Sequence, residues 1–422
     1  MERFDLVVIG GGPAGMAAAV AAKERGIERL LILEREARLG GILMQCIHNG
    51  FGLHRFKEEL TGPEYAARYE ERVRALGIEA RTEATVLSLA RDRIITVTDA
   101  VRGIYQICAG AVILAMGCRE RPRGALNIAG SRPAGVYTAG AAQKLVNIKG
   151  LLPGKRVVIL GSGDIGLIMA RRMTLEGAKV EAVCELMPYS GGLTRNIVQC
   201  LEDFGIPLYL SHTITQVHGR ERVSGVTVTR VDGNLRPVYE DSMEILCDTL
   251  LLSVGLIPEN ELTLQAGIRL DPITKGPAVN QLRQTAAEGI FACGNVLHVH
   301  DLVDYVSAEA EIAGRAAADY LMHGAAQAEE LSLSAGEGIR YVLPQRLRMD
   351  AQETELFFRA SDVIGEAEVA LRCGEKIVKR MKCRRLAPGE MQKLHLNREE
   401  LASLRVCDKL ILEVSQRKTA ER

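Results

Sequence analysis

The sequence predicts an α/β protein with two Rossmann-like domains and a small β-rich domain at the C-terminal end. Three observations predict this architecture. A glycine-rich turn at Gly10–Gly15 and another at Gly161–Gly166 each follow a short apolar run and precede a helical pattern. Beyond about residue 335 the pattern changes to short strands separated by β-turn residues. The order strand, glycine turn, helix is typical of the first βα step of a dinucleotide-binding fold.

The first turn follows the strand-like run 6–9 and fits the pattern G-x-G-x-x-G. In this pattern the first glycine makes the turn, the second lets the backbone approach a pyrophosphate, and the third lets the helix pack closely on the strand. Free N–H groups and the helix dipole favour negative charge there. The residues predicted to bind the cofactor are Gly10, Gly12, Pro13, Ala14 and Gly15.

The second turn follows the run 157–160 and repeats the pattern. Its predicted cofactor-binding residues are Gly161, Gly163, Asp164, Ile165 and Gly166. A further strand-like run ends in an acid 19 residues after the last glycine of each turn, at Glu34 and at Glu185. An acid at this place accepts hydrogen bonds from a ribose hydroxyl. The alternative, two coincidental turns with surface glutamates, is less consistent with this repeated context. Two dinucleotides in one chain indicate that they exchange electrons.

Composition argues against several other classes. Lys+Arg and Asp+Glu both total 53, and the chain has no Trp and only 4% aromatic residues, so we expect no nucleic-acid partner. No apolar run approaches the length of about 18 residues that a membrane-spanning helix needs, so we expect no transmembrane segment. The first strand starts within a few residues of Met1, which leaves no room for a signal peptide and favours a cytoplasmic location.

The ten cysteines contain no C-x-x-C pair, which argues against zinc-ribbon, ferredoxin-type and thioredoxin-type motifs. Scattered cysteines in a large chain without a secretion signal are expected to be reduced thiols. They are Cys46, Cys108, Cys118, Cys184, Cys200, Cys247, Cys293, Cys373, Cys383 and Cys407.

Periodicity predicts the remaining organisation. Helices are expected at 63–76, 137–148 and about 305–322, and short strands near 84–89, 93–98, 104–108 and 111–115. Residues 324–338 are expected to form a linker, followed by a hairpin around Gly374 and a last strand at 409–414. The predicted domains are 1–120 with 285–325, then 121–284, and a β-rich domain at 335–422 in which we find no catalytic or metal-binding motif.

The chain resembles the flavoproteins with two dinucleotide-binding domains, the pyridine-nucleotide-disulfide-oxidoreductase superfamily. The resemblance rests on the two fingerprints, on Ala115-Met116-Gly117 in the "ATG" position, and on the run GIFACGN at 289–295. It implies FAD in the first domain and NAD(H) in the second, which is inserted into the first. It also implies cofactor-binding roles for Gly41, Ala115, Gly117, Gly255, Gly294 and Asn295.

Two departures from the superfamily pattern matter. Its last motif usually ends in Asp, which contacts the flavin ribityl chain, whereas this chain has Asn295, whose amide oxygen can still accept. Counting from Gly41, the two cysteines of the redox disulfide fall on Leu43 and His48. The disulfide is therefore absent, and Cys46 alone remains nearby.

A closer resemblance is carried by residues 40–65, 117–126, 132–147 and 293–307. These look like a subgroup found beside flavin-dependent glycerol-3-phosphate dehydrogenases, often with a small cysteine-rich protein. They are also similar to the small FAD subunits of amine and opine oxidases and of hydrogen cyanide synthase. These resemblances imply an electron-transfer partner, a flavin-dependent dehydrogenase subunit or a small cysteine-rich protein, and allow an oligomer.

Several side chains remain open to more than one interpretation. Cys46, with His48 nearby, could be a catalytic thiolate that cycles through sulfenic acid, or a small filler under the flavin. His298, His300, Asp301 and Asp304 could be metal ligands, but i and i+2 residues in a loop rarely converge, so we expect no metal. A flavin-contacting or proton-handling role, or ordinary capping with Asp301 or Asp304 as a helix N-cap, are the alternatives.

We therefore expect an FAD-dependent enzyme that exchanges hydride with NAD(H), the nicotinamide stacking on the flavin. No arginine follows Glu185 to receive a 2′-phosphate, which favours NAD(H) over NADP(H). Without a dithiol relay, we expect electrons to pass to or from a partner dehydrogenase subunit. Glycerol 3-phosphate is the favoured candidate for the ultimate substrate. The alternatives are a stand-alone NADH oxidase or peroxidase that uses Cys46, and a non-catalytic nucleotide-binding subunit of an assembly.

Overall fold

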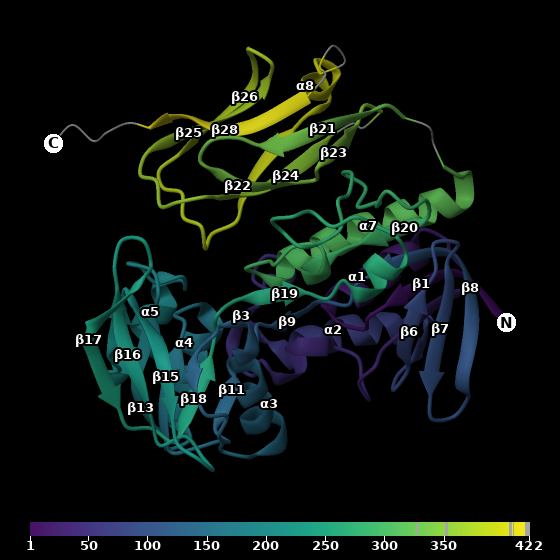
Figure 1. Ribbon diagram of the computed structural model, residues 1–422. Helices are drawn as coiled ribbons and strands as arrows, with labels where there is room; N and C mark the ends of the chain where they lie inside the picture. The colour runs from purple at the N-terminus through teal and green to yellow at the C-terminus, as the bar shows by residue number, and fades with distance from the viewer. Residues whose placement is uncertain (326–327, 351–352, 405–406, 408, 418–422) are drawn as a thin grey trace. The chain divides into compact units, whose positions relative to one another are not determined.

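The computed structural model describes residues 1–325, 328–350, 353–404, 407 and 409–417. The chain forms two compact units (Figure 1). The first unit contains Met1–Cys118 together with the chain from Pro258 onward, and the second unit contains Arg119–Ile257. The second unit is thus inserted into the first. The short strands β9 (Cys118–Glu120) and β19 (Leu256–Pro258) lie where the chain passes between them.

The first unit is built on a sheet with the order β5-β2-β1-β8-β7-β6, in which β20 also pairs with β8. Strands β1, β2, β5 and β20 are parallel to their neighbours, whereas β6, β7 and β8 pair antiparallel with one another. The strand bounds are β1 (Glu2–Ile9), β2 (Leu30–Leu33), β5 (Glu79–Arg81), β6 (Thr85–Leu89), β7 (Ile94–Asp99), β8 (Gly103–Leu114) and β20 (Ile290–Ala292).

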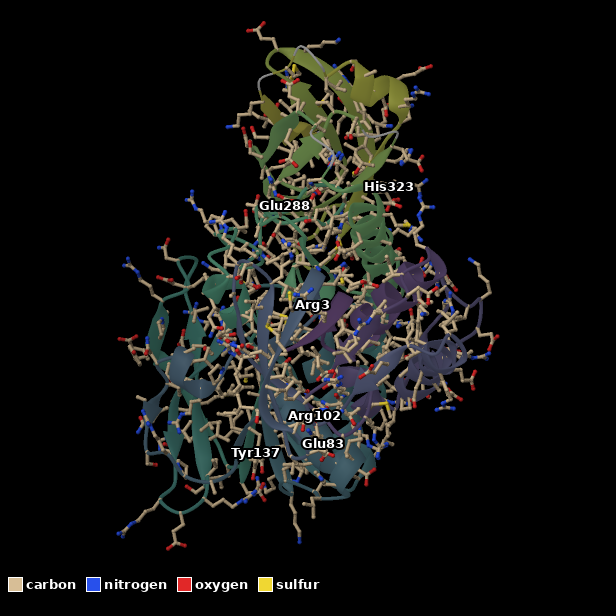
Figure 2. The ribbon with its side chains drawn as sticks, turned by 90° about the vertical axis from the view of Figure 1, so that its right-hand side faces the viewer. Arg3, Glu83, Arg102, Tyr137, Glu288 and His323 are labelled. Atoms are coloured by element: carbon tan, nitrogen blue, oxygen red, sulfur yellow. A yellow bond between two sulfur atoms is a disulfide. The ribbon has the colours of Figure 1, made fainter. Side chains whose placement is uncertain are left out.

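One face of this sheet is covered by α1 (Pro13–Glu24), α2 (Gly62–Ala75) and α7 (Val303–His323). The helices α1 and α7 can pack closely because their facing residues are small: a Cβ on Gly314 would lie 2.2 Å from the carbonyl oxygen of Ala18. The last turn of α7 ends at His323, which Figure 2 labels. Glu288 accepts a hydrogen bond from Tyr320 Oη at 3.0 Å.

The second unit contains a five-stranded parallel sheet with the order β11-β18-β12-β13-β14. Its strands are β11 (Val136–Thr138), β12 (Arg156–Leu160), β13 (Lys179–Glu185), β14 (Leu208–Leu210) and β18 (Thr249–Leu252), and its helices are α3 (Ala139–Lys149), α4 (Asp164–Leu175) and α5 (Thr194–Cys200). A second sheet, β10-β15-β16-β17, is formed by β10 (Ala129–Gly130), β15 (His212–His218), β16 (Gly225–Val231) and β17 (Pro237–Ile245).

The C-terminal strands form two sheets within the first unit, one with the order β23-β21-β28-β25-β26 and one with the order β22-β24-β27. They enclose an apolar core of their own. The elements are β21 (Glu330–Ala335), β22 (Ile339–Leu343), β23 (Arg346–Arg348), β24 (Thr354–Ala360), β25 (Ala367–Cys373), β26 (Lys376–Cys383), β27 (Gln392–Leu396), β28 (Lys409–Arg417) and the helix α8 (Arg398–Ala402). We call this part the C-terminal β domain.

Several sequence-based expectations differ from the structure. The sequence predicts a linker at 324–338, but this stretch contains β21, whose Leu331 and Leu333 are buried in the core of the C-terminal β domain. The polar residues beside these two leucines, Glu330, Ser332 and Ser334, mask this strand in the sequence. Residues 258–284, expected in the inserted domain, belong to the first unit, where α6 (Glu261–Gln265) lies and where Asn260 donates hydrogen bonds to the carbonyls of Lys275 and Val296.

The expectation of ten reduced thiols is wrong for one pair. Cys373 and Cys407 form a disulfide that joins the end of β25 to the segment before β28. The two residues are 34 positions apart, so no local spacing in the sequence points to the pair. Among the residues that the structure describes, no helix is both long and apolar enough to cross a membrane.

Candidate functional site

The first glycine-rich turn joins β1 to α1. Gly10 and Gly15 pack tightly against neighbouring backbone, whereas Gly12 faces open space. Gly10 has a φ of +107°, and a Cβ on it would lie 2.4 Å from the carbonyl oxygen of Ala115. A Cβ on Gly15 would lie 1.8 Å from the carbonyl oxygen of Gly10. A Cβ on Gly12 would meet no atom closer than 3.9 Å, and no side chain caps the start of α1. This is the arrangement that a pyrophosphate needs at a helix N-terminus.

The predicted ribose acid of the first unit lies at this turn. Glu34 is 6% exposed, and its carboxylate accepts hydrogen bonds from the N–H groups of Gly11 at 2.7 Å and Glu36 at 2.8 Å. Each carboxylate oxygen keeps a further acceptor direction for a ribose hydroxyl. Gly41 approaches the same turn, since a Cβ on it would lie 3.0 Å from the Cα of Gly12.

Two other strand ends meet at the same edge of the sheet. Ala115 and Gly117 follow β8, and Gly294 and Asn295 follow β20, which pairs with β8. Both Gly117 and Gly294 have a φ of +73°. Asn295 accepts a hydrogen bond from the His300 N–H at 3.1 Å, and its amide nitrogen donates to the sulfur of Cys118 at 3.6 Å. The turn, the acid and these strand ends fit a bound FAD, with Asn295 held in place by two neighbours.

The second unit repeats this construction. Gly161 has a φ of +100°, and a Cβ on it would lie 2.0 Å from the carbonyl oxygen of Ser253, whereas a Cβ on Gly163 would meet no atom within 4 Å. Gly166 packs against Gly161, with its Cβ position 2.5 Å from the Gly161 carbonyl oxygen. Gly255, after β18, has a φ of +103° and open space beside it. The residues therefore fit a second dinucleotide.

Glu185 is held more firmly than Glu34. Its carboxylate accepts from the Ser162 N–H at 2.8 Å, the Ser162 hydroxyl at 2.7 Å and the Met187 N–H at 3.0 Å. Asp164, predicted to bind the cofactor, uses one carboxylate oxygen to accept from the Leu193 N–H at 2.8 Å and the Asn196 amide at 2.7 Å. Asp164 thus holds the loop after β13, while Ile165 packs against the apolar core of this unit.

Sequence reasoning missed a parallel between the two units. Six residues after each acid comes a Gly-Gly pair, Gly40-Gly41 in one unit and Gly191-Gly192 in the other. Gly40 donates its N–H to the Gly11 carbonyl at 2.9 Å, and Gly191 donates to the Ser162 hydroxyl at 3.3 Å. The equal spacing in the sequence could have revealed that both turns are covered by the same kind of loop.

The surroundings of Cys46 favour a protonated thiol. It follows a short 3-10 helix, Gly41–Gln45, and its carbonyl accepts the Gly62 N–H at 2.8 Å. The thiol donates to the Ile42 carbonyl at 3.4 Å, and burial raises the pKa of Cys46 to about 12. His48 contacts the ring of Phe51 at 5.0 Å. These contacts argue against a thiolate nucleophile at neutral pH.

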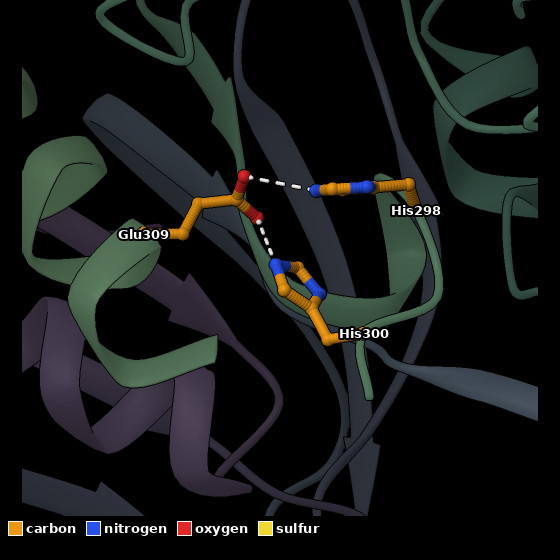
Figure 3. A group of neighbouring side chains, drawn as sticks. All are labelled: His298, His300 and Glu309. Atoms are coloured by element: carbon orange, nitrogen blue, oxygen red, sulfur yellow. Dashed lines mark hydrogen bonds and ion pairs between the residues drawn. The ribbon is translucent and has the colours of Figure 1, made fainter. Parts of the chain in front are cut away.

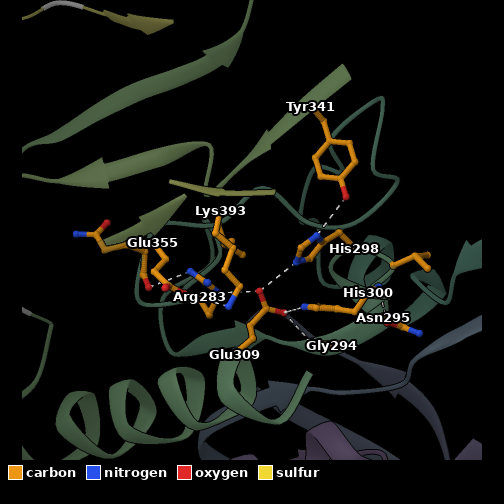
Figure 4. A network of polar contacts seen from close by, with 12 residues as sticks. Arg283, Gly294, Asn295, His298, His300, Glu309, Tyr341, Glu355 and Lys393 are labelled. Carbon is orange, nitrogen blue, oxygen red and sulfur yellow. Dashed lines mark hydrogen bonds and ion pairs between the residues drawn. The ribbon is translucent and has the colours of Figure 1, made fainter. Parts of the chain in front are cut away.

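A buried polar cluster lies between the flavin motif and α7. The rings of His298 and His300 both point at the carboxylate of Glu309 (Figure 3), and none of the three is more than 1% exposed. The Nε2 atoms lie 3.2 Å and 3.4 Å from the carboxylate oxygens. Arg283 Nε and the Gly294 N–H each donate to the same carboxylate at 3.0 Å (Figure 4). Glu309 was missed because it lies on the helix, well beyond the loop.

The three side chains could also surround a metal ion, since their ligand atoms lie within 4.8 Å of one another. Three donors, however, already hydrogen-bond this carboxylate: Arg283 Nε, the Gly294 N–H and His298 Nε2. A divalent ion would add two positive charges beside the buried guanidinium of Arg283. Burial lowers the pKa of His300 to about 3, with His298 adding to the effect, so its ring is neutral. We interpret the cluster as a hydrogen-bonded network.

Burial alone would raise the pKa of Glu309, but His298, His300 and Arg283 together hold it below its usual range. The two aspartates considered with the histidines lie elsewhere. Asp301 pairs with Arg359, and Asp304 accepts the His54 N–H at 3.3 Å. The N-cap of α7 is Leu302, without a side-chain cap, so the expectation that Asp301 or Asp304 caps this helix is wrong.

Comparisons with known proteins agree with this arrangement. The family model described as pyridine nucleotide-disulphide oxidoreductase matches residues 4–317. A subunit of the opine oxidase of Agrobacterium tumefaciens is 27% identical over 341 residues, which cover 75% of this chain and 65% of the relative. The HcnB subunit of the hydrogen cyanide synthase of Pseudomonas protegens is 24% identical, covering 95% of this chain and 86% of the relative. Dihydrolipoyl dehydrogenase of Pseudomonas aeruginosa is 29% identical, covering 70% and 66%.

Among solved structures, T. acidophilum thioredoxin reductase has a TM-score of 0.62 at 23% identity, covering 76% of this chain and 99% of that one. At this identity the likeness shows the fold alone. The family model extends over both glycine-rich turns and over the flavin motif. The chain therefore belongs to the pyridine nucleotide-disulphide oxidoreductase family and is an oxidoreductase of the kind that uses FAD and NAD(P)H.

Proposed function

We propose that this chain exchanges hydride between NAD(H) and FAD and passes electrons to or from a partner dehydrogenase subunit. The observation that supports the proposal is that two glycine-rich turns, each with an acid beside it, occur in a chain that lacks the redox disulfide. Bound FAD would supply the hydride chemistry with NAD(H) and the onward electron transfer. The residues of the chain supply the binding: Gly12 and Glu34 for one dinucleotide, Gly163 and Glu185 for the other.

The absence of a dithiol relay supports a partner. The two positions that would hold the disulfide are Leu43 and His48, and Cys46 has a raised pKa. The flavin therefore has no pair of cysteine sulfurs beside it that could accept its electrons. Two relatives, the opine oxidase polypeptide and HcnB, are named as subunits of larger enzymes. We propose that this chain likewise works in an assembly in the cytoplasm.

We further propose NAD(H) as the nucleotide and glycerol 3-phosphate as the ultimate substrate. The carboxylate of Glu185, fixed by three donors, would repel a 2′-phosphate at the adenosine ribose. The substrate proposal rests on the resemblance of residues 40–65 and 293–307 to proteins found beside glycerol-3-phosphate dehydrogenases.

The proposal is tested by purifying the tagged chain from its own host and identifying proteins that remain bound. The isolated complex is then given glycerol 3-phosphate and NAD⁺ without oxygen. We expect that a flavin-dependent dehydrogenase co-purifies and that the complex forms NADH when substrate is present, which the chain alone does not support. Rapid turnover of the isolated chain with NADH and oxygen or peroxide would instead make it an oxidase or peroxidase.

A further inference from the structure

The position of the Asn295 side-chain amide depends on the loop between the flavin motif and α7. This loop, residues 298–302, follows the short 3-10 helix Gly294–Val296 and leads into α7. The His300 N–H donates to the Asn295 amide oxygen at 3.1 Å. A shift of the loop would therefore move or release the side chain that we assign to the flavin ribityl chain.

Glu309 holds this loop from one side. Its carboxylate accepts the N–H of Gly294 and lies within hydrogen-bond distance of His298 Nε2, as Figure 4 shows. Arg283, 1% exposed, balances the charge of the carboxylate. The contacts join the flavin motif and the loop to a fixed point on α7.

The C-terminal β domain also contacts the loop, and the guanidinium of Arg359 makes two of these contacts. Arg359, on β24, donates from Nη2 to the Val299 carbonyl at 3.1 Å and to the carboxylate of Asp301. Asp301 also accepts the Met391 N–H at 2.7 Å. The ring of His298 contacts Tyr341 and Phe357 of the same domain.

The remaining donors of Arg359 stay within its own domain. Nε donates to the Tyr341 hydroxyl at 3.1 Å, and Nη1 donates to the carbonyl oxygens of Gly389 at 2.6 Å and Pro388 at 3.4 Å. The side chain is 11% exposed. One planar fork thus fixes two segments of the C-terminal β domain and two groups of the loop, a pattern that a lysine ammonium cannot reproduce.

We propose that the C-terminal β domain holds the loop 298–302 in place, an arrangement we call the clamp. Arg359 is the positioning residue through which this domain acts. The family match ends at residue 317, before the C-terminal β domain begins. The inference rests on the proposed place of Asn295 at the flavin. The inference predicts that FAD affinity, the flavin spectrum and the midpoint potential depend on Arg359, although this side chain does not contact the glycine-rich turn Gly10–Gly15.

The test compares the full-length variants R359M, R359K and D301N with the control R380M. Arg380 lies in the same domain, but its side chain is 53% exposed and it pairs only with Glu368 at 2.9 Å among the contacts described. FAD is titrated into each apoprotein, and the flavin spectrum and midpoint potential are recorded. We expect R359M and R359K to weaken FAD binding roughly tenfold and to shift the potential. R380M should stay within about twofold of the wild type.

Binding and potential unchanged in a folded R359M variant would overturn the clamp. If R359M does not fold, D301N decides, because it removes the charge on the loop side of the same contact. A separate N295A variant tests the assumption beneath the inference. If N295A binds FAD like the wild type, the assignment of Asn295 to the flavin is wrong. If N295A loses FAD binding but D301N and R359K keep it, that assignment holds and only the clamp is refuted.

Discussion

Glu34 and Glu185 occupy equivalent places, but their neighbours differ by one hydroxyl. The residue after the first glycine is Gly11 in one unit and Ser162 in the other. Gly11 offers only its N–H, at 2.7 Å, whereas Ser162 donates its N–H and its hydroxyl to the same oxygen of Glu185. The carboxylate of Glu185 is therefore fixed before any nucleotide binds, which supports discrimination at the ribose.

Glu185→Gln should weaken the preference for NADH over NADPH. The amide keeps the shape of the side chain but removes the charge that repels a 2′-phosphate, so the NADH/NADPH ratio of kcat/KM should fall roughly tenfold. Glu181→Gln, on the same strand and paired with Arg156 at 2.9 Å, is the matched control and should leave the ratio unchanged. A wild type that prefers NADPH, or an unchanged ratio in the Glu185 variant, contradicts the assignment.

Cys46→Ser should leave reduction of the flavin by NADH nearly unchanged. The thiol is protonated because burial raises its pKa to about 12, and no second sulfur occupies the family position. The substitution should cost at most about 1–3 kcal/mol of stability. Stopped-flow absorbance measures the reduction, with thermal unfolding as the control. If the variant keeps FAD but loses turnover, and a sulfenic acid can be trapped in the wild type, Cys46 is catalytic.

His300 should make the protein less stable as the pH falls. Its folded-state pKa, about 3, lies below its ordinary value of 6.5, so the unfolded chain binds more protons between those two values. The free energy of unfolding should therefore decrease from about pH 6.5 downward, by about 1.4 kcal/mol for each pH unit well inside that window. The lowered pKa of Glu309 adds a loss of the same sign at lower pH. Denaturant titrations of the wild type and His300→Gln measure it; parallel pH profiles would contradict the argument.

At the scale of elements, each glycine-rich turn leaves room for a pyrophosphate because the second glycine of its G-x-G pattern, Gly12 or Gly163, faces open space. Gly12 and Gly163 both have negative φ angles, of −73° and −67°, so a β-branched side chain is compatible with the backbone there. Neither position would place a Cβ within 3.4 Å of another atom. A larger side chain therefore fills the space proposed for the pyrophosphate while the fold stays intact.

Gly163→Val should abolish reduction by NADH but leave FAD bound, and Gly12→Val should release FAD. The two variants control for each other, since the same substitution is made in separate units. Flavin absorbance of the purified proteins and anaerobic bleaching by NADH give the two readouts. Loss of FAD in the Gly163 variant, or normal bleaching in it, would show that the second turn is not the NAD(H) site.

The elements that the sequence predicted well are those with a local signature. The runs before Gly10 and Gly161 became β1 and β12, and the expected helix at about 305–322 is α7. Glu34 and Glu185 lie at the ends of β2 and β13 as the sequence predicted, whereas their hydrogen bonds to the glycine-rich turns were not predicted. Such features depend on residues close in the chain, where glycine conformation and apolar periodicity set the outcome.

The features that escaped prediction depend on distant residues. Arg283 reaches Glu309 across 26 positions, and Arg359 reaches Asp301 across 58, so no spacing rule connects them. The disulfide between Cys373 and Cys407 likewise joins residues that are 34 positions apart, at the end of the paired strands β25 and β28. Buried polar partners satisfy one another in three dimensions, and their chemistry becomes visible only with the fold.

At the scale of the whole molecule, a dinucleotide-binding unit is inserted into another one, and a β domain is added to the outer unit. We assign FAD binding to the outer unit and NAD(H) binding to the inserted one. The account makes hydride exchange between these two cofactors its central claim, with no thiol required.

Anaerobic stopped-flow mixing of the FAD-loaded protein with NADH tests that claim most directly. We predict that the flavin absorbance bleaches in the wild type and in Cys46→Ser, more slowly with NADPH, and not in Gly163→Val. A wild type whose bound flavin stays oxidised in the presence of excess NADH would contradict the claim and leave a nucleotide-binding protein without hydride transfer.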